Sequence, residues 1–278
     1  MAKMRLMSQN LWAYQNNNEY WEALGLDCSA EVRMTANVQI LKDVLPDIIG
    51  GQEICRDMQR YLMLACHEEG LPYAYIWGND TPILYRAERF ELLDTEFFLY
   101  PEYLDGIEGS VNNNKTKSVT VAVFRDKKDG KVLVFATTHL WFKSELKRPG
   151  SNAARLWQMK RAIELIEKYR QKYNGCPAVL VGDMNSRYAS IAIQHALGEG
   201  GFSHAHDIAT DFRHEGCGYN TCCTKNPGEW CEGPFENAID HILVKGLPEG
   251  AISRFDRYCP DYYLTISDHA PVYIDMEL

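Results

Sequence analysis

The order of apolar segments, which mixes hairpins with long helical stretches, restricts the fold more than any other feature. Ser118–Arg125 and Lys131–Leu140 are rich in β-forming residues and are joined by DKKDG, so they predict a β-hairpin. Glu31–Leu45 and Ala153–Lys172 carry apolar residues at helical spacing and predict amphipathic helices. A chain with both hairpins and crossover helices is typical of mixed sheets covered by helices.

The remaining segments complete this pattern. A further helix is predicted at Asp57–Glu69, and 199–236 reads as irregular. Further strands are predicted at Met4–Asn10, Asp47–Ile54, Tyr73–Trp77, Pro82–Arg86, Arg89–Leu93, Ala178–Gly182, Ile239–Val244 and Ala270–Glu277. We therefore predict an α/β four-layer sandwich, in which two mixed β-sheets lie face to face with helices on the outer faces. Without repeats or linkers, residues 1–278 are expected to form a single domain.

Composition and charge limit the kinds of molecule that the protein can bind. The formal net charge of -9 disfavours tight, sequence-blind nucleic-acid binding, but it is compatible with a small phosphorylated substrate met by a bound cation. No apolar run approaches the length of a membrane span, and no signal peptide is recognisable. The nine cysteines are scattered, as is typical of free thiols in a reducing compartment. We expect a cytoplasmic monomer that makes no membrane contact.

Polar side chains stand at the ends of the apolar strands, where packing alone does not require them. They are Asn10, Glu53, His139, Asp183, Asn185, Asp240, Asp268 and His269. Carboxylate and amide oxygens suit Mg²⁺ or Mn²⁺, and the other groups would orient water and contact phosphate oxygens. The pattern predicts a metal-dependent phosphoester hydrolase.

Each of these residues also has a structural explanation when it is taken alone. Asp183 and Asn185 could form a GDxN turn, His139 could be a hydrogen-bonded core histidine, and Glu53 could cap the following helix. No single structural explanation accounts for all eight positions. The joint pattern therefore favours a functional site.

Six motifs occur in one order over nearly the whole chain. They are SQNLW at 8–12, GGQE at 50–53, TTHL at 137–140, VGDMN at 181–185, AIDHI at 238–242 and SDHAPV at 267–272. In these motifs the sequence resembles the endonuclease/exonuclease/phosphatase superfamily, and within it an uncharacterised bacterial branch. The resemblance implies a DNase I-like sandwich and a hydrolase that acts on phosphate esters.

The resemblance also implies a role for each motif residue. Glu53 is similar to the main metal-binding glutamate, Asn10 to the amide beside it, and Asp268 to a further acid near the metal. The implied cofactor is Mg²⁺ or Mn²⁺.

The remaining motif residues resemble the family's catalytic groups. Asp183 resembles the residue that positions or deprotonates the attacking water, and Asn185 one close to the phosphate. His139 and His269 resemble the pair that contacts phosphoryl oxygens, and Asp240 resembles the acid that holds the second histidine. The implied reaction is in-line attack of water on phosphorus, with Asp183 or a histidine as the base.

Three classes of function remain to be weighed. The acidic charge favours a small or exposed phosphoester, such as a sugar, inositol, lipid head-group or nucleotide phosphate. The alternative is a metal-dependent nuclease, either an endonuclease or a 3′ exonuclease similar to deadenylases, acting on DNA or RNA. The sequence differs from abasic-site endonuclease motifs in the runs QEI and GDMNSRYAS, which disfavours that branch of nucleases. It also lacks the WCDR run of inositol polyphosphate 5-phosphatases. A non-catalytic scaffold is disfavoured, because the residue set is complete.

Several residues keep two interpretations. Substrate choice is expected in loops 13–29, 95–117, 141–152 and 200–236, whose aromatic residues either stack on substrate or pack the loops. These residues are Trp21, Tyr100, Tyr103, Trp141, Phe142 and Trp230. Arg155 and Gln158 either contact a loop or substrate, or begin a solvated helix. Asn79 or Asp80 either supports His139, the first histidine of the pair, or has no part in the site. The Cys- and His-rich segment 204–231 either binds zinc or, as is more common, carries free thiols.

Overall fold

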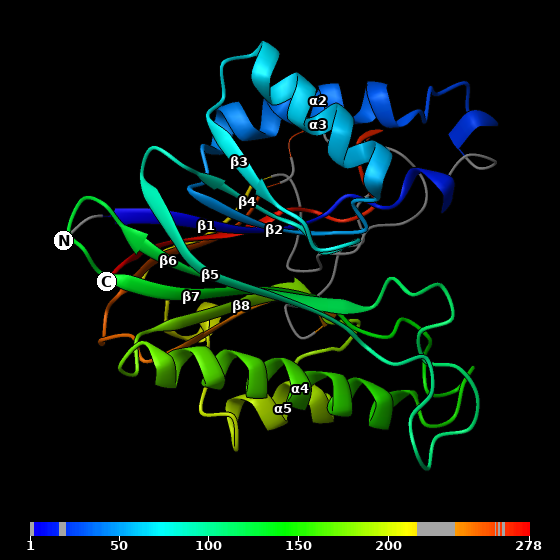
Figure 1. The fold of residues 1–278 in the computed structure, drawn as a ribbon. Coiled ribbons are helices and arrows are strands. Elements are labelled where there is room, and N and C mark those ends of the chain that lie inside the picture. Colours follow the sequence, from blue (N-terminus) through cyan, green and yellow to red (C-terminus); the bar gives the residue numbers. More distant parts are fainter. Residues whose placement is uncertain (1–2, 17–20, 216–236, 259, 261, 263–264) are drawn as a thin grey trace.

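Two β-sheets lie face to face, with helices on both outer faces (Figure 1). The computed structural model describes residues 3–16, 21–215, 237–258, 260, 262 and 265–278. Helices α2 (Ala30–Val44) and α3 (Arg56–Glu68) cover one sheet, and α4 (Ser151–Lys172) and α5 (Ile191–Leu197) cover the other. The predicted four-layer α/β sandwich is therefore confirmed.

One sheet has seven strands. Their spatial order is β10 (Phe212–Glu215), β12 (Ile252–Tyr258), β13 (Val272–Glu277), β1 (Lys3–Asn10), β2 (Ile48–Gln52), β4 (Ile83–Arg86) and β3 (Tyr73–Ile76). Because β1 runs parallel to β2, the last residue of β1, Asn10, pairs with Gln52. The residue after β2, Glu53, thus emerges at the same end of the sheet as Asn10.

The second sheet has six strands. Their spatial order is β5 (Phe90–Leu99), β6 (Ser118–Asp126), β7 (Val132–His139), β8 (Ala178–Asp183), β11 (Asp240–Lys245) and β9 (Ser203–His204). Strand β7 is parallel to β8, and β11 is antiparallel to it. The register therefore places His139 opposite Asp183, and Asp183 opposite Asp240, in one row across the sheet.

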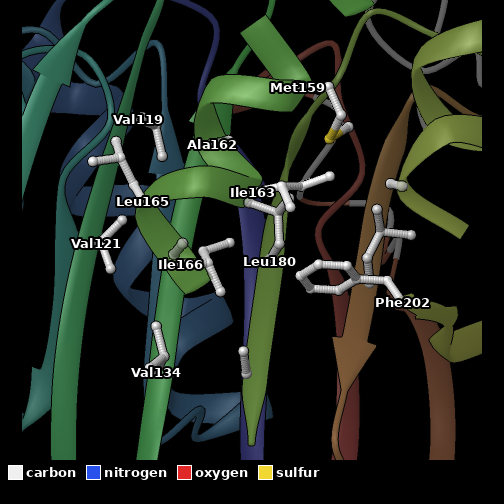
Figure 2. Close-up of a cluster of buried hydrophobic side chains, with 14 of the residues drawn as sticks. Val119, Val121, Val134, Met159, Ala162, Ile163, Leu165, Ile166, Leu180 and Phe202 are labelled. Atoms are coloured by element: carbon white, nitrogen blue, oxygen red, sulfur yellow. The ribbon is translucent and has the colours of Figure 1, made fainter. Parts of the chain in front are cut away.

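Apolar side chains fill each space between layers. In Figure 2, Ala162, Leu165 and Ile166 of α4 lie over the outer face of the six-stranded sheet. A second buried cluster lies between the sheets, and a third lies beneath α2 and α3. This packing fixes the strand ends relative to one another.

The structure corrects parts of the sequence prediction. The strand predicted at Arg89–Leu93 extends to Leu99, so the loop expected at 95–117 begins inside a strand. Strand β12 was not predicted, because its buried face includes polar side chains. The start of the segment expected to be irregular instead forms β9, the short helix α6 (Ala205–Ile208) and β10. None of the described helices is long and apolar enough to cross a membrane.

Candidate active site

Strand ends from both sheets meet at one end of the sandwich. A carboxylate oxygen of Glu53, another of Asp183 and a ring nitrogen of His139 all lie within 4.8 Å of one another. His139 Nε2 is 3.4 Å from Asp183 Oδ2 and 3.8 Å from Glu53 Oε1. Two carboxylates and an imidazole at this spacing fit the donor set of a divalent cation.

Asn10 lies beside this group and directs its amide in a defined way. Its Oδ1 accepts the Trp12 N–H at 2.8 Å, so its Nδ2 donates to Asp183 Oδ2 at 3.0 Å. The backbone N–H fixes the orientation of the amide, because it can only donate. Asn10 thus connects β1 of one sheet to the end of β8 in the other.

The second histidine is held by a carboxylate. His269 Nδ1 lies 2.8 Å from Asp240 Oδ2, and an ionised carboxylate only accepts, so Nδ1 carries the proton. His269 Nε2 then lies 3.9 Å from both Asp183 Oδ2 and Asp268 Oδ1. Asp240 therefore holds His269 in one tautomer, with Nε2 facing the other site residues.

Three residues at the site have left-handed backbone conformations, although none is glycine. They are Trp12 with φ 44°, Glu53 with φ 54° and Asn185 with φ 46°. Such conformations cost on the order of 1–3 kcal/mol each and persist only where the surroundings impose them. Asn185 is fixed by its N–H, which donates to Asp183 Oδ1 at 2.9 Å, and by its Nδ2, which donates to Leu140 O at 3.0 Å.

The pKa values of the site carboxylates shift in opposite directions. Burial raises the pKa of Glu53 and of Asp183, but the histidines and Lys117 outweigh it, so both pKa values are lowered. Burial raises the pKa of Asp268 to about 6, because the opposing charge of His269 is offset by the charges of Glu53 and Asp183. An excess of negative charge therefore remains at Asp268, which is the environment that favours a bound cation.

A pocket of about 620 Å³ opens onto these residues. Its charged and imidazole-bearing lining residues are Glu53, Asp80, Lys117, Asp183 and His269. Its amide and aromatic lining residues are Gln15, Asn16, Asn112, Asn113, Asn114, Asn185, Trp12, Trp141 and Phe142. The volume falls within the range of small-molecule sites.

Lys117 is a site residue that the sequence did not reveal. Its Nζ lies 2.5 Å from His139 Nε2 and 3.1 Å from Nδ1. Burial lowers the pKa of Lys117, and the charges of Glu53, Asp183 and Asp80 oppose this. Asp80, rather than Asn79, lines the pocket, whereas Asn79 Nδ2 donates to Lys115 O at 2.7 Å.

The first turns of α4 contact a loop. Arg155 donates to Trp141 O at 3.1 Å and to Lys143 O at 2.7 Å. Gln158 Oε1 accepts the Trp141 N–H at 2.8 Å. Both side chains are buried, so the interpretation as a loop contact applies, and they fix the segment that carries Trp141 and Phe142 to the pocket.

The aromatic residues of the predicted loops divide into two groups. Trp21, Tyr100 and Trp141 are buried, whereas Tyr103 and Phe142 are exposed, and Trp230 lies outside the described residues. Trp21 packs on Trp12 with ring centroids 5.2 Å apart. Packing therefore accounts for Trp21 and Tyr100, and Trp141 combines burial with a place in the pocket wall.

Two buried histidines connect the site to the neighbouring strands. His204 Nδ1 accepts the His206 N–H at 3.2 Å, so His204 Nε2–H donates to His241 Nδ1 at 2.9 Å. His241 Nε2–H then donates to Ser186 O at 2.7 Å. The zinc and free-thiol interpretations of this region depend on Cys217, Cys222, Cys223 and Cys231, which lie outside the described residues, so both stay open.

Comparison with known proteins decides the family. The sequence model of the Endonuclease/Exonuclease/phosphatase family matches residues 21–269. The chain belongs to this family. It is thus a hydrolase of phosphate esters with a DNase I-like fold, as the motifs predicted. No curated protein matches the chain in sequence.

Solved structures of other family members share the fold. An endonuclease/exonuclease/phosphatase from Bacteroides vulgatus is 22% identical, with a TM-score of 0.73 and 100% of both chains covered. A mannosyl-6-phosphatase from Bacteroides thetaiotaomicron is 19% identical, with a TM-score of 0.72, covering 99% of this chain and 100% of the other. D. rerio TDP2 complexed with a single-strand DNA product is 17% identical, with a TM-score of 0.67 and 100% of both chains covered.

Proposed function

We propose that this protein hydrolyses the phosphate ester of a small or exposed phosphorylated molecule with the help of Mg²⁺ or Mn²⁺. The observation that carries the proposal is the cluster of Glu53, His139 and Asp183 beside a pocket of about 620 Å³. A pocket of this size accommodates a small molecule rather than a nucleic-acid duplex. The net charge of -9 also disfavours long polyanions.

Each site residue has a task in this proposal. Glu53 would hold the cation with Asp268 and Asn10 near it, and His139 and Asp183 would border the same cation. The bound cation would neutralise charge on the phosphoryl oxygens. Asp183 is ionised at neutral pH because its pKa is lowered, so it can accept a hydrogen bond from the attacking water. The attack forms one P–O bond as the bond to the leaving oxygen breaks.

The histidines would act on the phosphoryl group and on protons. Asp240 holds the Nδ1–H of His269, so Nε2 is the atom that exchanges a proton or contacts an oxygen. His139 lies on the opposite side of Asp183, and Asn185 is fixed beside Asp183. Asp183 and the two histidines are the candidates for the general base.

The pocket lining favours a polar small molecule. Its amides offer donors and acceptors for hydroxyl groups, and Trp141 and Phe142 offer apolar faces. A related fold in a mannosyl-6-phosphatase supports a sugar phosphate, and a related fold in TDP2 with its DNA product supports the nuclease alternative. We place the phosphorylated small molecule first because of the charge and the pocket.

A substrate panel tests the proposal. Phosphomonoesters, phosphodiesters, plasmid DNA and RNA oligonucleotides are incubated with Mg²⁺, Mn²⁺ or EDTA, using wild type and a Glu53→Gln/His269→Ala double variant. Glu68→Gln, which changes an exposed glutamate on α3, is the matched control. We expect small-molecule turnover that EDTA and the double variant abolish. Turnover that survives both would disprove the metal mechanism, and cleavage of nucleic acid alone would establish the nuclease.

A further inference from the structure

We infer that Lys117 binds the phosphoryl group of the substrate and that Asn112 positions Lys117 for this task; the inference rests on the proposed function. Lys117 directly precedes β6 and is only 6% exposed, yet it lines the pocket. Its Nζ lies against the ring of His139. Among the described residues that line the pocket, it is the sole lysine or arginine.

The ammonium group of Lys117 makes no direct contact with a carboxylate in the described part of the chain, and the charges of Glu53, Asp183 and Asp80 act on it from a greater distance. No carboxylate oxygen of these residues lies within 4.0 Å of Nζ, and the hydrogen bonds of Nζ go to His139 alone. Burying a cation is costly unless an anion compensates for it. A buried ammonium group that faces a pocket is therefore suited to receive an anion from that pocket.

A phosphate ester in the pocket would supply an anion in direct contact with Lys117. The same pocket also carries Glu53, Asp80 and Asp183, which repel a phosphoryl group unless cations offset their charge. Glu53 and Asp183 lie 3.8 Å and 3.4 Å from the His139 Nε2 that Lys117 contacts. Lys117 would contact the phosphoryl oxygens from the side of His139, and charge-assisted hydrogen bonds of this kind are about twice as strong as neutral ones. The Nζ also lies 5.5 Å from the centre of the half-exposed Phe142 ring, which lines the same pocket.

The side chain of Asn112 holds the backbone of Lys117 on both sides. Asn112 Oδ1 accepts the Lys117 N–H at 2.9 Å, and Asn112 Nδ2 donates to Lys117 O at 2.9 Å. The same Nδ2 donates to Tyr100 O at 2.7 Å, and the Tyr100 N–H donates to Lys117 O at 3.0 Å. Asn112 is 1% exposed, so water does not compete for these bonds. Asn112 is thus a positioning residue that acts through Lys117.

Binding of inorganic phosphate to the Mg²⁺-loaded protein tests the inference without relying on turnover. The variants are Lys117→Met, Lys117→Gln and Lys117→Arg, with Lys115→Met as the matched control, because Lys115 is exposed on the same loop. We expect Lys117→Met and Lys117→Gln to weaken phosphate binding about 10-fold or more in calorimetry, since one charged hydrogen bond is lost. Lys117→Arg should restore most of the affinity, and Lys115→Met should change nothing.

Steady-state kinetics separate this role from a purely structural one. With a turned-over phosphomonoester, Lys117→Met should lower kcat/KM about 10²-fold or more, with the Mg²⁺ concentration at half-maximal rate unchanged. Asn112→Ala should lower kcat/KM less, and Asn112→Ala/Lys117→Met should be no worse than Lys117→Met alone. A folded Lys117→Met or Lys117→Gln protein with wild-type phosphate affinity would overturn the inference.

The outcomes distinguish this inference from the proposed function. If the Lys117→Met protein turns over substrate as fast as the wild type, the role of Lys117 is disproved and the proposed function is unaffected. Phosphate binding that depends on Lys117, in a wild-type protein that hydrolyses no small phosphoester, supports the anion site and contradicts the proposed function.

Discussion

The two ends of the space between the sheets are built from different chemistry. At the end away from the site, apolar side chains such as Leu6, Leu133 and Phe135 fill the gap. At the site end, buried hydroxyls and amides cross it: Gln52 Nε2 lies 2.9 Å from Thr137 Oγ1, and Thr81 Oγ1 lies 2.8 Å from Ser118 Oγ. Apolar burial is non-directional, whereas buried hydrogen bonds fix one arrangement.

The difference shows how one sandwich combines stability with a precise site. The apolar end holds the sheets together through buried area, and the polar end sets their register beside the catalytic groups. Gly50 lies where the apolar part of the space between the sheets meets the polar part. A Cβ at this position would be 2.4 Å from Val181 Cγ2 and 2.7 Å from Thr137 Cβ, so the close approach of the sheets requires glycine. Asn10 and Asp183, from opposite sheets, can hydrogen-bond only at this close approach. Variants at the two ends should therefore have separable effects.

The largest effect is expected from removing charge at the polar end. Asp183→Asn should lower kcat about 10²–10⁴-fold, because the amide accepts a hydrogen bond from water more weakly and cannot take a proton. The protein should remain folded, since the apolar end is unchanged. Initial rates over a substrate series, with circular dichroism of the same samples, measure this, and a loss of less than 10-fold contradicts the assignment.

Truncating a core side chain at the apolar end should lower stability and leave activity almost unchanged. Leu133→Ala is expected to lower the free energy of unfolding by about 2–5 kcal/mol, through lost burial and a cavity. Its activity per folded molecule should stay within a few-fold of wild type. Leu146→Ala is the control, because Leu146 is 98% exposed whereas Leu133 is 1% exposed. Urea denaturation measures both variants, and equal stability losses would refute the contrast.

The contribution of Asp268 to the stability of the metal-free protein should fall as pH rises. Its folded pKa of about 6 exceeds its ordinary value of 3.8, so the folded state favours the protonated form. Stability is then greatest below about pH 4 for this group and falls by on the order of 2–3 kcal/mol as pH rises to 6. The lowered pKa of Asp183 makes its contribution to stability rise with pH, but that contribution is already complete above the pKa that Asp183 has in the unfolded chain.

Thermal unfolding in EDTA from pH 4 to 7 measures this dependence. Asp268→Asn should flatten the curve, and saturating Mg²⁺ should stabilise wild type at pH 7 more than the variant. Identical pH profiles for the two proteins would show that Asp268 is not the group responsible.

The smallest effect is expected from one hydrogen bond between the sheets. Thr81→Val preserves shape but removes a hydroxyl that donates to Gly78 O at 2.9 Å and contacts Ser118 Oγ. The expected loss of unfolding free energy is about 1–2 kcal/mol. Thr35→Val, at an exposed position of α2, should stay within about 0.5 kcal/mol. If both variants unfold alike, the polar layer adds no measurable stability.

Local sequence predicted most of the sandwich because strand periodicity and turn residues are short-range signals. The hairpin of β6 and β7 and the helix α4 lie close to their predicted limits. Strand β12 was missed because Asp256 is buried through a hydrogen bond from Tyr273 of the neighbouring strand, and such pairing leaves no apolar alternation to read.

The motif residues could be found because polar groups at apolar strand ends are conspicuous in sequence. Lys117 and Asn112 could not, since they lie in the run NNNKTKS, whose composition is that of a solvated loop. Lys117 is buried against His139 of β7, and Asn112 is hydrogen-bonded to Tyr100 and to Lys117, and these contacts exist only in the folded protein. Arg155 likewise reads as a solvated helix start until the loop it holds is known.

The pairing of β1 with β13 determines when the site can exist during synthesis. Residues at opposite ends of the described chain, Lys3 and Glu277, are partners in the middle of a sheet, and Arg5 forms an ion pair with Asp275 at 2.6 Å. Asp268 and His269 immediately precede β13, so they reach the site only when that strand docks. The candidate site therefore stays incomplete in a nascent chain until β13 has left the ribosome, and pairings between residues so far apart in sequence form slowly.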